Sequence, residues 1–109
     1  MEYEINYLQC INLRYKSFYK KAQIATFKDG TKVLHSYSTD VAYIDNKGTL
    51  HRLWNGESAT SLRHVDEFTL QFMNVRSYAS GVDGWRKMSV ETLSNEYKCE
   101  FTENYKTTL

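Results

Sequence analysis

The stretch from Asn55 to Met73 constrains the fold most strongly, because a polar loop leads directly into a segment with clear helical periodicity. Apolar side chains recur there every three or four residues, as one face of an α-helix requires; they are Leu62, Val65, Phe68 and Phe72. The opposite face is predicted to carry Arg63, Asp66, Glu67 and Gln71. Ser58 or Thr60 is expected to cap the helix, and Asn74 to end it in the left-handed conformation.

Short strands are expected before this helix. Apolar and polar residues alternate over Glu2 to Leu8, which predicts a half-buried strand. Further strands are predicted at 22–27, at 32–37 continuing through a bend or bulge at 38–40 into 41–44, and at 49–54. Asp29-Gly30 predicts a type I′ hairpin turn, and residues 46–48 predict a second turn. Strands joined by such short turns are antiparallel, so the pattern predicts an α+β fold with a meander of three or more strands.

The position of the helix on the sheet is left open by the sequence. Val41 and Tyr43 are expected on one sheet face, with Ala42 and Ile44 on the other. A short second helix is predicted near residues 85–94, and an edge strand at 96–102. Residues 1–102 are expected to form a single domain, followed by a tail at 103–109.

Composition limits the classes of function. A net charge of +1 over 109 residues argues against a strong nucleic-acid footprint. The scattered residues His35, His51 and His64 do not complete a zinc spacing, and neither a metal nor a cofactor is expected. The sequence has no apolar run of membrane-spanning length and no signal pattern, so cytoplasmic localisation with free thiols at Cys10 and Cys99 is expected; a disulfide between them is the alternative.

Charge and aromatic residues are distributed unevenly. Tyrosines alternate with lysines in the N-terminal half, and we predict a partner-binding set there; it comprises Tyr15, Lys16, Tyr19, Lys20, Lys21, Lys28 and Lys32. Such mixtures are typical of single-stranded nucleic-acid sites and of protein hot spots. The C-terminal part is acidic, with Glu91, Glu96, Glu100 and Glu103. The alternative interpretation is two solvated charged faces.

Polar residues gather at the predicted helix N-terminus. Backbone N–H groups and the helix dipole attract anions there, so a candidate anion-binding set is defined by Ser58, Thr60, Ser61, Arg63 and His64. Ordinary capping is the alternative. Asp66 and Glu67 diverge by about 100° around the helix and do not form a convergent carboxylate pair. The sequence shows no catalytic motif, so a non-enzymatic protein is expected.

Three stretches of the chain match a known sequence pattern. SFYKKA (17–22), HSYSTDVAYID (35–45) and SATSLRHVDEF (58–68) are similar to SFYxKA, SYxTxVAxI and SATTxRHVxEF. In these stretches the chain resembles a family of small accessory proteins from phages, plasmids and integrative elements of Gram-positive bacteria. The resemblance covers residues 17–72. It departs from the pattern at Lys20, where a Gly is common, and at Ser61, where a second Thr is usual.

The resemblance implies an accessory protein of a mobile element that binds a host machine or inhibits a host defence. The expected partner is a host defence protein, with a CRISPR-associated RNA-guided nuclease or its guide complex as the specific candidate. Either the basic segment engages the nucleic-acid-binding surface of this target, or the acidic segment mimics phosphates. The alternatives are a small nucleic-acid-binding or regulatory protein and a nucleotide-binding accessory protein. The chain is expected to act as a monomer or homodimer, without a membrane partner.

Overall fold

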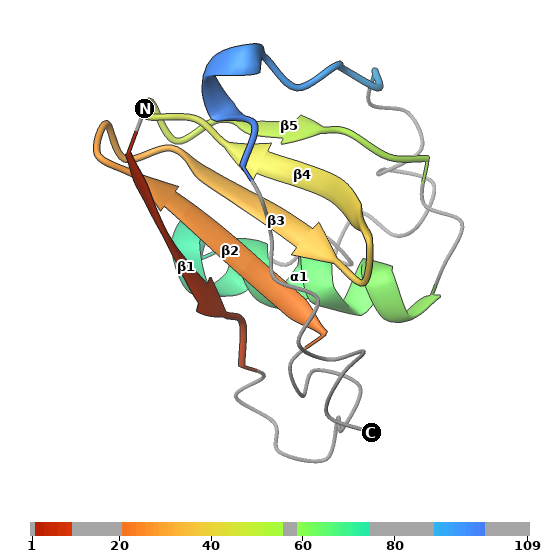
Figure 1. The fold of residues 1–109 in the computed structure, drawn as a ribbon. Helices are drawn as coiled ribbons and strands as arrows, with labels where there is room; N and C mark the ends of the chain where they lie inside the picture. Colours follow the sequence, from red (N-terminus) through yellow and green to blue (C-terminus); the bar gives the residue numbers. More distant parts are fainter. Residues whose placement is uncertain (1, 10–20, 56–58, 75–88, 100–109) are drawn as a thin grey trace.

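The computed structural model describes residues 2–9, 21–55, 59–74 and 89–99, and within them it confirms the predicted α+β class. Five antiparallel strands form one sheet in which each strand pairs with its neighbours in the chain. The strands are β1 (Tyr3–Tyr7), β2 (Ala22–Phe27), β3 (Lys32–Ser36), β4 (Thr39–Ile44) and β5 (Leu50–Arg52). The helix α1 (Ala59–Met73) crosses one face of this sheet (Figure 1).

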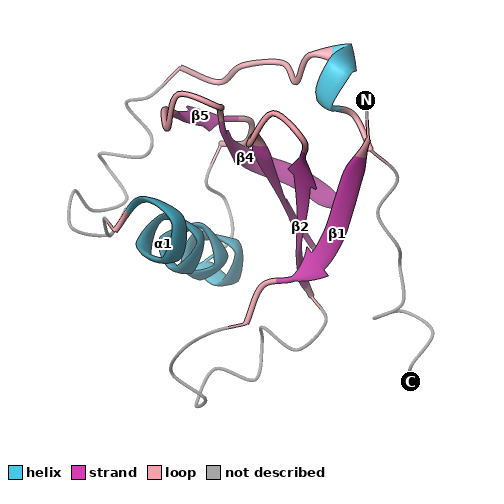
Figure 2. Ribbon diagram, turned by 90° about the vertical axis from the view of Figure 1, so that its left-hand side faces the viewer, coloured by secondary structure: helices cyan, strands magenta, loops and turns pink. Residues whose placement is uncertain are grey.

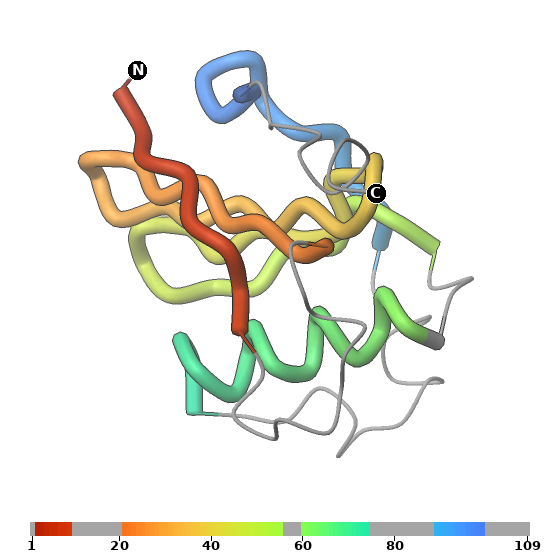
Figure 3. Tube along the Cα trace, turned by 60° about the horizontal axis from the view of Figure 1, so that its bottom comes forward, coloured from red at the N-terminus to blue at the C-terminus, as the bar shows by residue number. Residues whose placement is uncertain are grey.

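Different parts of the chain cover the two sheet faces. The face beneath α1, called here the helix face, is apolar; Leu8, Ile24 and Leu34 pack there against Val65 and Phe68 of α1. The opposite face, called here the outer face, packs against the C-terminal segment 89–99 through Ala25, Phe27, Val33 and Leu93. Figures 2 and 3 show α1 and this segment on opposite sides of the strands. The sheet is therefore the middle of three layers.

The loops between β2 and β3 and between β4 and β5 share one geometry. The Gly30 N–H donates to the Phe27 carbonyl at 3.0 Å, and the Gly48 N–H donates to the Asp45 carbonyl at 3.0 Å. Both glycines have positive φ, 97° and 87°. The two turns are confirmed, but the type I′ prediction at Asp29-Gly30 is wrong, because Asp29 lacks positive φ. The glycine instead closes a longer loop in the left-handed conformation.

The prediction of one bent strand over residues 32–44 is wrong. The chain reverses after Ser36, which pairs with Thr39 across a tight turn at Tyr37 and Ser38. Tyr37 has a φ of 58°, and its N–H donates to the Lys21 carbonyl at 2.8 Å. A left-handed conformation costs about 1–2 kcal/mol for a residue with a Cβ atom. Because residues with a Cβ atom rarely adopt the left-handed conformation, a tyrosine at position 37 gives no sign of a turn in the sequence.

A β-bulge changes which residues of β4 face the helix. Leu34 pairs with Ala42, but the next residue, His35, pairs with Asp40, so Val41 is an extra residue in β4. Val41 and Ala42 consequently both belong to the helix-face core. The predicted grouping of Val41 with Tyr43 is wrong for this reason, whereas Ala42 and Ile44 share a face as expected.

The helix is confirmed, and so is its end at Asn74, which has a φ of 56°. Thr60 lies inside the first turn and is not the N-cap residue, while Ser58 lies outside the described residues. The buried face is rotated from the predicted one, since Glu67 is buried and Phe72 is 42% exposed. Positions i, i+3, i+4 and i+7 share a face, which brings two polar residues inward beside Val65 and Phe68; they are Ser61 and His64.

The C-terminal segment differs from both predictions made for it. Residues 89–94 are not helical, because the Glu91 N–H donates to the Arg52 carbonyl at 2.8 Å and Val90 forms a parallel bridge with Arg52. Residues 95–97, at the start of the predicted edge strand, form a 3₁₀ turn. Tyr97 and Cys99 still face the sheet, which explains their alternation. Residues 85–88 of the predicted helix and 100–102 of the predicted edge strand lie outside the described residues, and so does the predicted tail 103–109. The domain range 1–102 stays a prediction.

Candidate functional site

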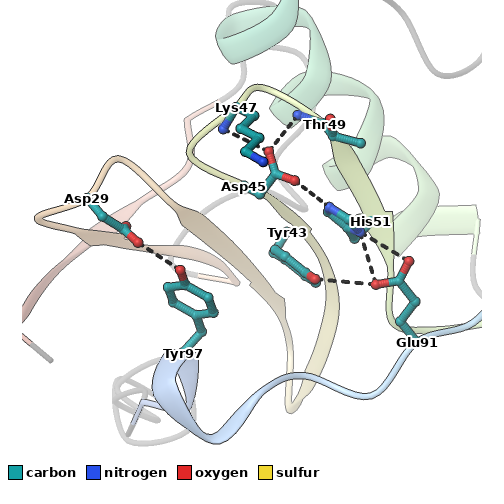
Figure 4. A network of polar contacts seen from close by, with 8 residues as sticks. All are labelled: Asp29, Tyr43, Asp45, Lys47, Thr49, His51, Glu91 and Tyr97. Atoms are coloured by element: carbon teal, nitrogen blue, oxygen red, sulfur yellow. Dashed lines mark hydrogen bonds and ion pairs between the residues drawn. The ribbon is translucent and has the colours of Figure 1, made fainter.

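A network of polar side chains lies at the β4–β5 side of the outer face (Figure 4). The hairpin register pairs Tyr43 on β4 with His51 on β5, and their rings stack at 4.3 Å between centroids with an interplanar angle of 8°. Asp45 follows β4, and Glu91 comes from segment 89–99. The network therefore joins the sheet to the layer that covers it.

His51 lies between two carboxylates. Its Nε2 is 2.7 Å from Asp45 Oδ2, and its Nδ1 is 2.9 Å from Glu91 Oε2. A neutral imidazole has one N–H donor and one lone pair, so it can donate to only one of these partners. The imidazolium donates to both. The geometry thus favours the protonated ring, which also gains from stacking on the electron-rich face of Tyr43.

The carboxylate of Asp45 is fixed in place by the loop that follows it. Its Oδ1 accepts the backbone N–H groups of Lys47 and Thr49, each at 2.9 Å. The hydrogen bond with His51 and these two backbone bonds lower the pKa of Asp45 to about 2. Asp45 is therefore a rigid, ionised acceptor for His51 at neutral pH.

The pKa values of His51 and Tyr43 are both raised. Partial burial by itself lowers the pKa of His51, but the hydrogen bonds and negative charges of Asp45 and Glu91 outweigh it. Burial raises the pKa of Tyr43, and the charge of Glu91 raises it further. The Tyr43 hydroxyl remains a proton donor and lies 3.3 Å from Glu91 Oε2. Within this network His51 is the group that titrates closest to neutral pH.

A hydrogen-bonded pair, Tyr97 and Asp29, lies on the outer face near the β2–β3 loop. The Tyr97 hydroxyl donates to Asp29 Oδ2 at 2.7 Å, while Asp29 Oδ1 accepts the Thr31 N–H at 2.9 Å. Both hydrogen bonds lower the pKa of Asp29, and the bond from the Thr31 N–H has the larger effect. The Tyr97 ring also stacks against Tyr43, with centroids 6.3 Å apart. The outer face thus presents tyrosine rings beside carboxylates that are held by hydrogen bonds.

A different polar cluster lies on the helix face. The Ser36 hydroxyl is 2.8 Å from Ser61 Oγ and 2.7 Å from His64 Nδ1. All three residues are buried, and the Tyr37 ring stacks on His64 at 5.8 Å. This cluster ties the left-handed turn at Tyr37 to the first turns of α1. His64 is 0% exposed, so the cluster is part of the buried interface between α1 and the sheet, where satisfied polar groups help to fix the docking of a helix.

The structure does not bring the whole candidate anion-binding set together. Ser61 and His64 point into the core, Arg63 is exposed, and Thr60 is half buried. Ser58 lies outside the described residues. That these residues bind an anion stays a prediction, but Ser61 and His64 are engaged with Ser36.

The lysines of the predicted partner-binding set are dispersed where the structure describes them. Lys21 and Lys28 flank β2, and at about 3.3 Å per residue their Cα atoms are about 20 Å apart. Lys28 pairs with Glu2 at 2.6 Å, and the Lys32 ammonium lies 5.3 Å from the centre of the Phe72 ring. Tyr15, Lys16, Tyr19 and Lys20 lie outside the described residues.

The outer-face network was missed by the sequence analysis. The pairing of Tyr43 with His51 follows from the turn at 46–48, so the predicted hairpin contained a signal for it. Glu91 gave none, because its approach to His51 depends on how segment 89–99 crosses the sheet. Across residues 2–9, 21–55, 59–74 and 89–99, no cluster of three His, Cys, Asp or Glu residues is arranged to hold a metal ion, and no helix there could cross a membrane.

Fold and site define a small α+β protein with a meander sheet between a helix and a C-terminal segment. The chain belongs to a family of unknown function, DUF8033, which matches residues 7–84. Neither a curated protein nor a solved structure matches the chain. The matched range contains Ser36, Ser61 and His64, whereas Glu91 lies beyond it.

Proposed function

We propose that this protein acts by binding a macromolecular partner, and that this partner is an effector of a host defence system. The resemblance to accessory proteins of phages and mobile elements motivates this proposal. The specific partner we propose is a CRISPR-associated RNA-guided nuclease or its guide complex, in the cytoplasm of a bacterial host cell. The proposed role is inhibition by occupation of a functional surface, without catalysis.

The outer face is the observation that supports this role best. Tyr43 and Tyr97 offer rings with polar tips, which are enriched at protein interfaces. Asp29 and Asp45 have lowered pKa values and are ionised at neutral pH. The two carboxylates around the His51 imidazolium leave that group with net negative charge. Such a surface complements a basic, nucleic-acid-binding channel.

The acidic version of the inhibitor hypothesis therefore has better support than the basic one. Glu91 and Glu96 lie in segment 89–99, which packs on the same face as Tyr43. Both glutamates are exposed. Of the basic set, by contrast, Lys21 and Lys28 are separated by the length of β2, and Lys28 is paired with Glu2.

A charge-reversal pair tests the proposed surface. We expect Glu96→Lys to weaken binding to the nuclease about tenfold or more, because it places a positive charge against a basic channel. Glu4→Lys is the matched control, since Glu4 is also exposed but alternates with the outer-face residues Tyr3 and Ile5. The measurements are the affinity for the purified nuclease and its rate of DNA cleavage with each variant present.

The outcomes separate the alternatives. Equal binding by wild type and Glu96→Lys, together with loss of binding in a Lys16→Glu, Lys20→Glu, Lys21→Glu variant, would move the interface to the basic segment. Binding of oligonucleotides alone, with a steep salt dependence, would instead support a nucleic-acid-binding protein. Unchanged DNA cleavage with saturating wild-type protein would contradict inhibition of the nuclease.

A further inference from the structure

We infer that His51 forms a pH-dependent clasp, which fastens segment 89–99 to the outer face of the sheet and loosens as the pH rises through the titration of this histidine. The inference does not depend on the partner proposed above. It concerns how firmly the third layer of the fold is held in place.

The clasp joins parts of the chain that are far apart in sequence. Asp45 follows β4, His51 lies on β5, and Glu91 lies forty residues beyond His51. His51 is 2.7 Å from Asp45 and 2.9 Å from Glu91, so the protonated ring connects the hairpin to the C-terminal segment. Without the second proton, one of these contacts places a nitrogen lone pair against a carboxylate.

The groups that face His51 come from two elements besides its own strand. From the β4–β5 hairpin these are the Tyr43 ring of β4, stacked at 4.3 Å, and the carboxylate of Asp45, which follows β4. From segment 89–99 it is Glu91, which is also 3.3 Å from the Tyr43 hydroxyl. Tyr97, also from this segment, stacks against the Tyr43 ring. Between about pH 6 and 9 the charge that changes in this network is that of His51, since Asp45 has a pKa of about 2 and the pKa of Tyr43 is raised above 10.0.

The sign of the effect follows from the raised pKa of His51. A cation whose pKa is higher in the fastened state stabilises that state fully at pH values below its ordinary value of 6.5. This contribution disappears as the pH rises through the raised value. The clasp is therefore closed in mildly acidic solution and weakened in alkaline solution.

Other contacts of segment 89–99 do not involve His51. The Glu91 N–H bonds to the Arg52 carbonyl, the Leu93 side chain is buried, and Tyr97 bonds to Asp29. These contacts remain when His51 loses its proton. Loosening is therefore expected within the segment and not as unfolding of the sheet, so the test needs a local probe.

Cys99 provides such a probe. It is half buried against the outer face, and burial raises the pKa of its thiol to about 12, so it reacts slowly while the segment is in place. A Cys10→Ser background leaves Cys99 as the single thiol of the full chain. The alkylation rate of Cys99 by iodoacetamide is measured from pH 5.5 to 8.5, with and without His51→Gln. Dividing the two rates at each pH cancels the intrinsic reactivity of the thiol and every effect of pH that is equal in the two proteins.

We expect His51→Gln to be labelled faster than the background protein at pH 5.5, by up to about tenfold for each unit by which the pKa of His51 is raised. The two rates should converge as the pH rises through the titration of His51. The pH at which they converge should follow the titration of the His51 ring measured by NMR. A rate ratio that does not vary with pH, or that follows another histidine, would overturn the inference.

A matched pair of glutamates provides the control. Glu91→Gln should reproduce the fast labelling of His51→Gln at pH 5.5, because it removes the carboxylate at Nδ1. Glu96→Gln, in the same segment and exposed, should retain the slow labelling of the background protein. Equal effects of the two substitutions would show that general charge in the segment, and not the clasp, sets the rate.

Discussion

A polar cluster with a histidine lies on each side of the sheet, around His64 of α1 on the helix face and around His51 of β5 on the outer face, and the partners of the two rings differ in chemistry. On the helix face, fully buried His64 bonds to the hydroxyl of Ser36, which also contacts Ser61. On the outer face, half-buried His51 lies between the carboxylates of Asp45 and Glu91. The first cluster fixes the position of a helix, and the second fixes the position of a segment through charge.

The difference reflects the cost of burying charge. A carboxylate in the core loses its hydration, and this loss can exceed the gain from an ion pair. Hydroxyl groups satisfy a buried imidazole without that penalty. At the rim of the sheet, water still reaches Asp45 and Glu91, so ion pairs with His51 form there with a smaller loss of hydration. Only the outer cluster should therefore respond to pH through paired charges.

The largest expected effect comes from breaking the helix-face cluster. His64→Ala should lower the free energy of unfolding by about 3 kcal/mol, because it leaves a cavity and removes a partner of buried Ser36. Urea unfolding measures the change. Arg63→Ala, at the exposed neighbouring position of the same helix, is the control and should cost about 0.5 kcal/mol or less. A loss below about 1 kcal/mol for His64→Ala would show that the cluster does not hold the helix.

The next effect tests whether segment 89–99 is a structural layer. Leu93 is 8% exposed and packs with Ala25, Phe27 and Val33, so Leu93→Ala should cost about 2 kcal/mol. Val90→Ala is the control, since Val90 is 48% exposed, and should cost well under about 1 kcal/mol. Similar small losses for both variants would mean that the outer face is held mainly by its polar contacts.

A smaller effect on stability is expected from Asp45, whose carboxylate belongs to the outer-face cluster and is protonated only in strong acid. Asp45 has its pKa lowered to about 2, so its stabilising contribution is present above its ordinary value of 3.8 and is lost as the pH falls through about 2. Asp45→Asn should lower the melting temperature by a few degrees at pH 6, and the difference from wild type should shrink at pH 2. Thermal unfolding at the two pH values measures it. A difference that stays constant would contradict the proposed role of the ionised carboxylate.

The smallest effect concerns the ion pair of Lys28 with Glu2. Both side chains are more than three-quarters exposed, at 76% and 78%, so Lys28→Ala should change the free energy of unfolding by at most about 0.5 kcal/mol. Urea unfolding in low and high salt measures the change. A loss above about 1 kcal/mol would show that this exposed ion pair stabilises the fold more than is expected for charges screened by water and salt.

Two of the three stretches that carry the family resemblance, 35–45 and 58–68, contribute residues that meet in the folded chain. Ser36 and Tyr37 come from the strand pattern, and Ser61 and His64 come from the helix pattern. They converge on the helix-face cluster, where Ser61, the departure from the pattern, still supplies a hydroxyl. These residues therefore have a structural explanation. The candidate anion-binding set, which includes Ser61 and His64, is not needed to account for the presence of these two residues.

Local interactions explain what the sequence determined by itself. Periodicity predicted α1, Asn74 predicted its end, and the glycine turns predicted an antiparallel meander. Each of these signals depends on φ angles or on spacing within a few residues. The α+β class follows from them.

Contacts between distant residues decided the rest. The reversal at Tyr37 and the bulge at Val41 are stabilised by packing against α1, which no local pattern records. Residues 89–94, the described part of the helix predicted at 85–94, are not helical, because the edge of β5 offers a backbone partner and the outer face offers an apolar surface. The clasp at His51 exists only because that segment carries Glu91 across the sheet. Short-range propensity cannot determine such contacts, since their energy depends on which surfaces the folded chain brings together.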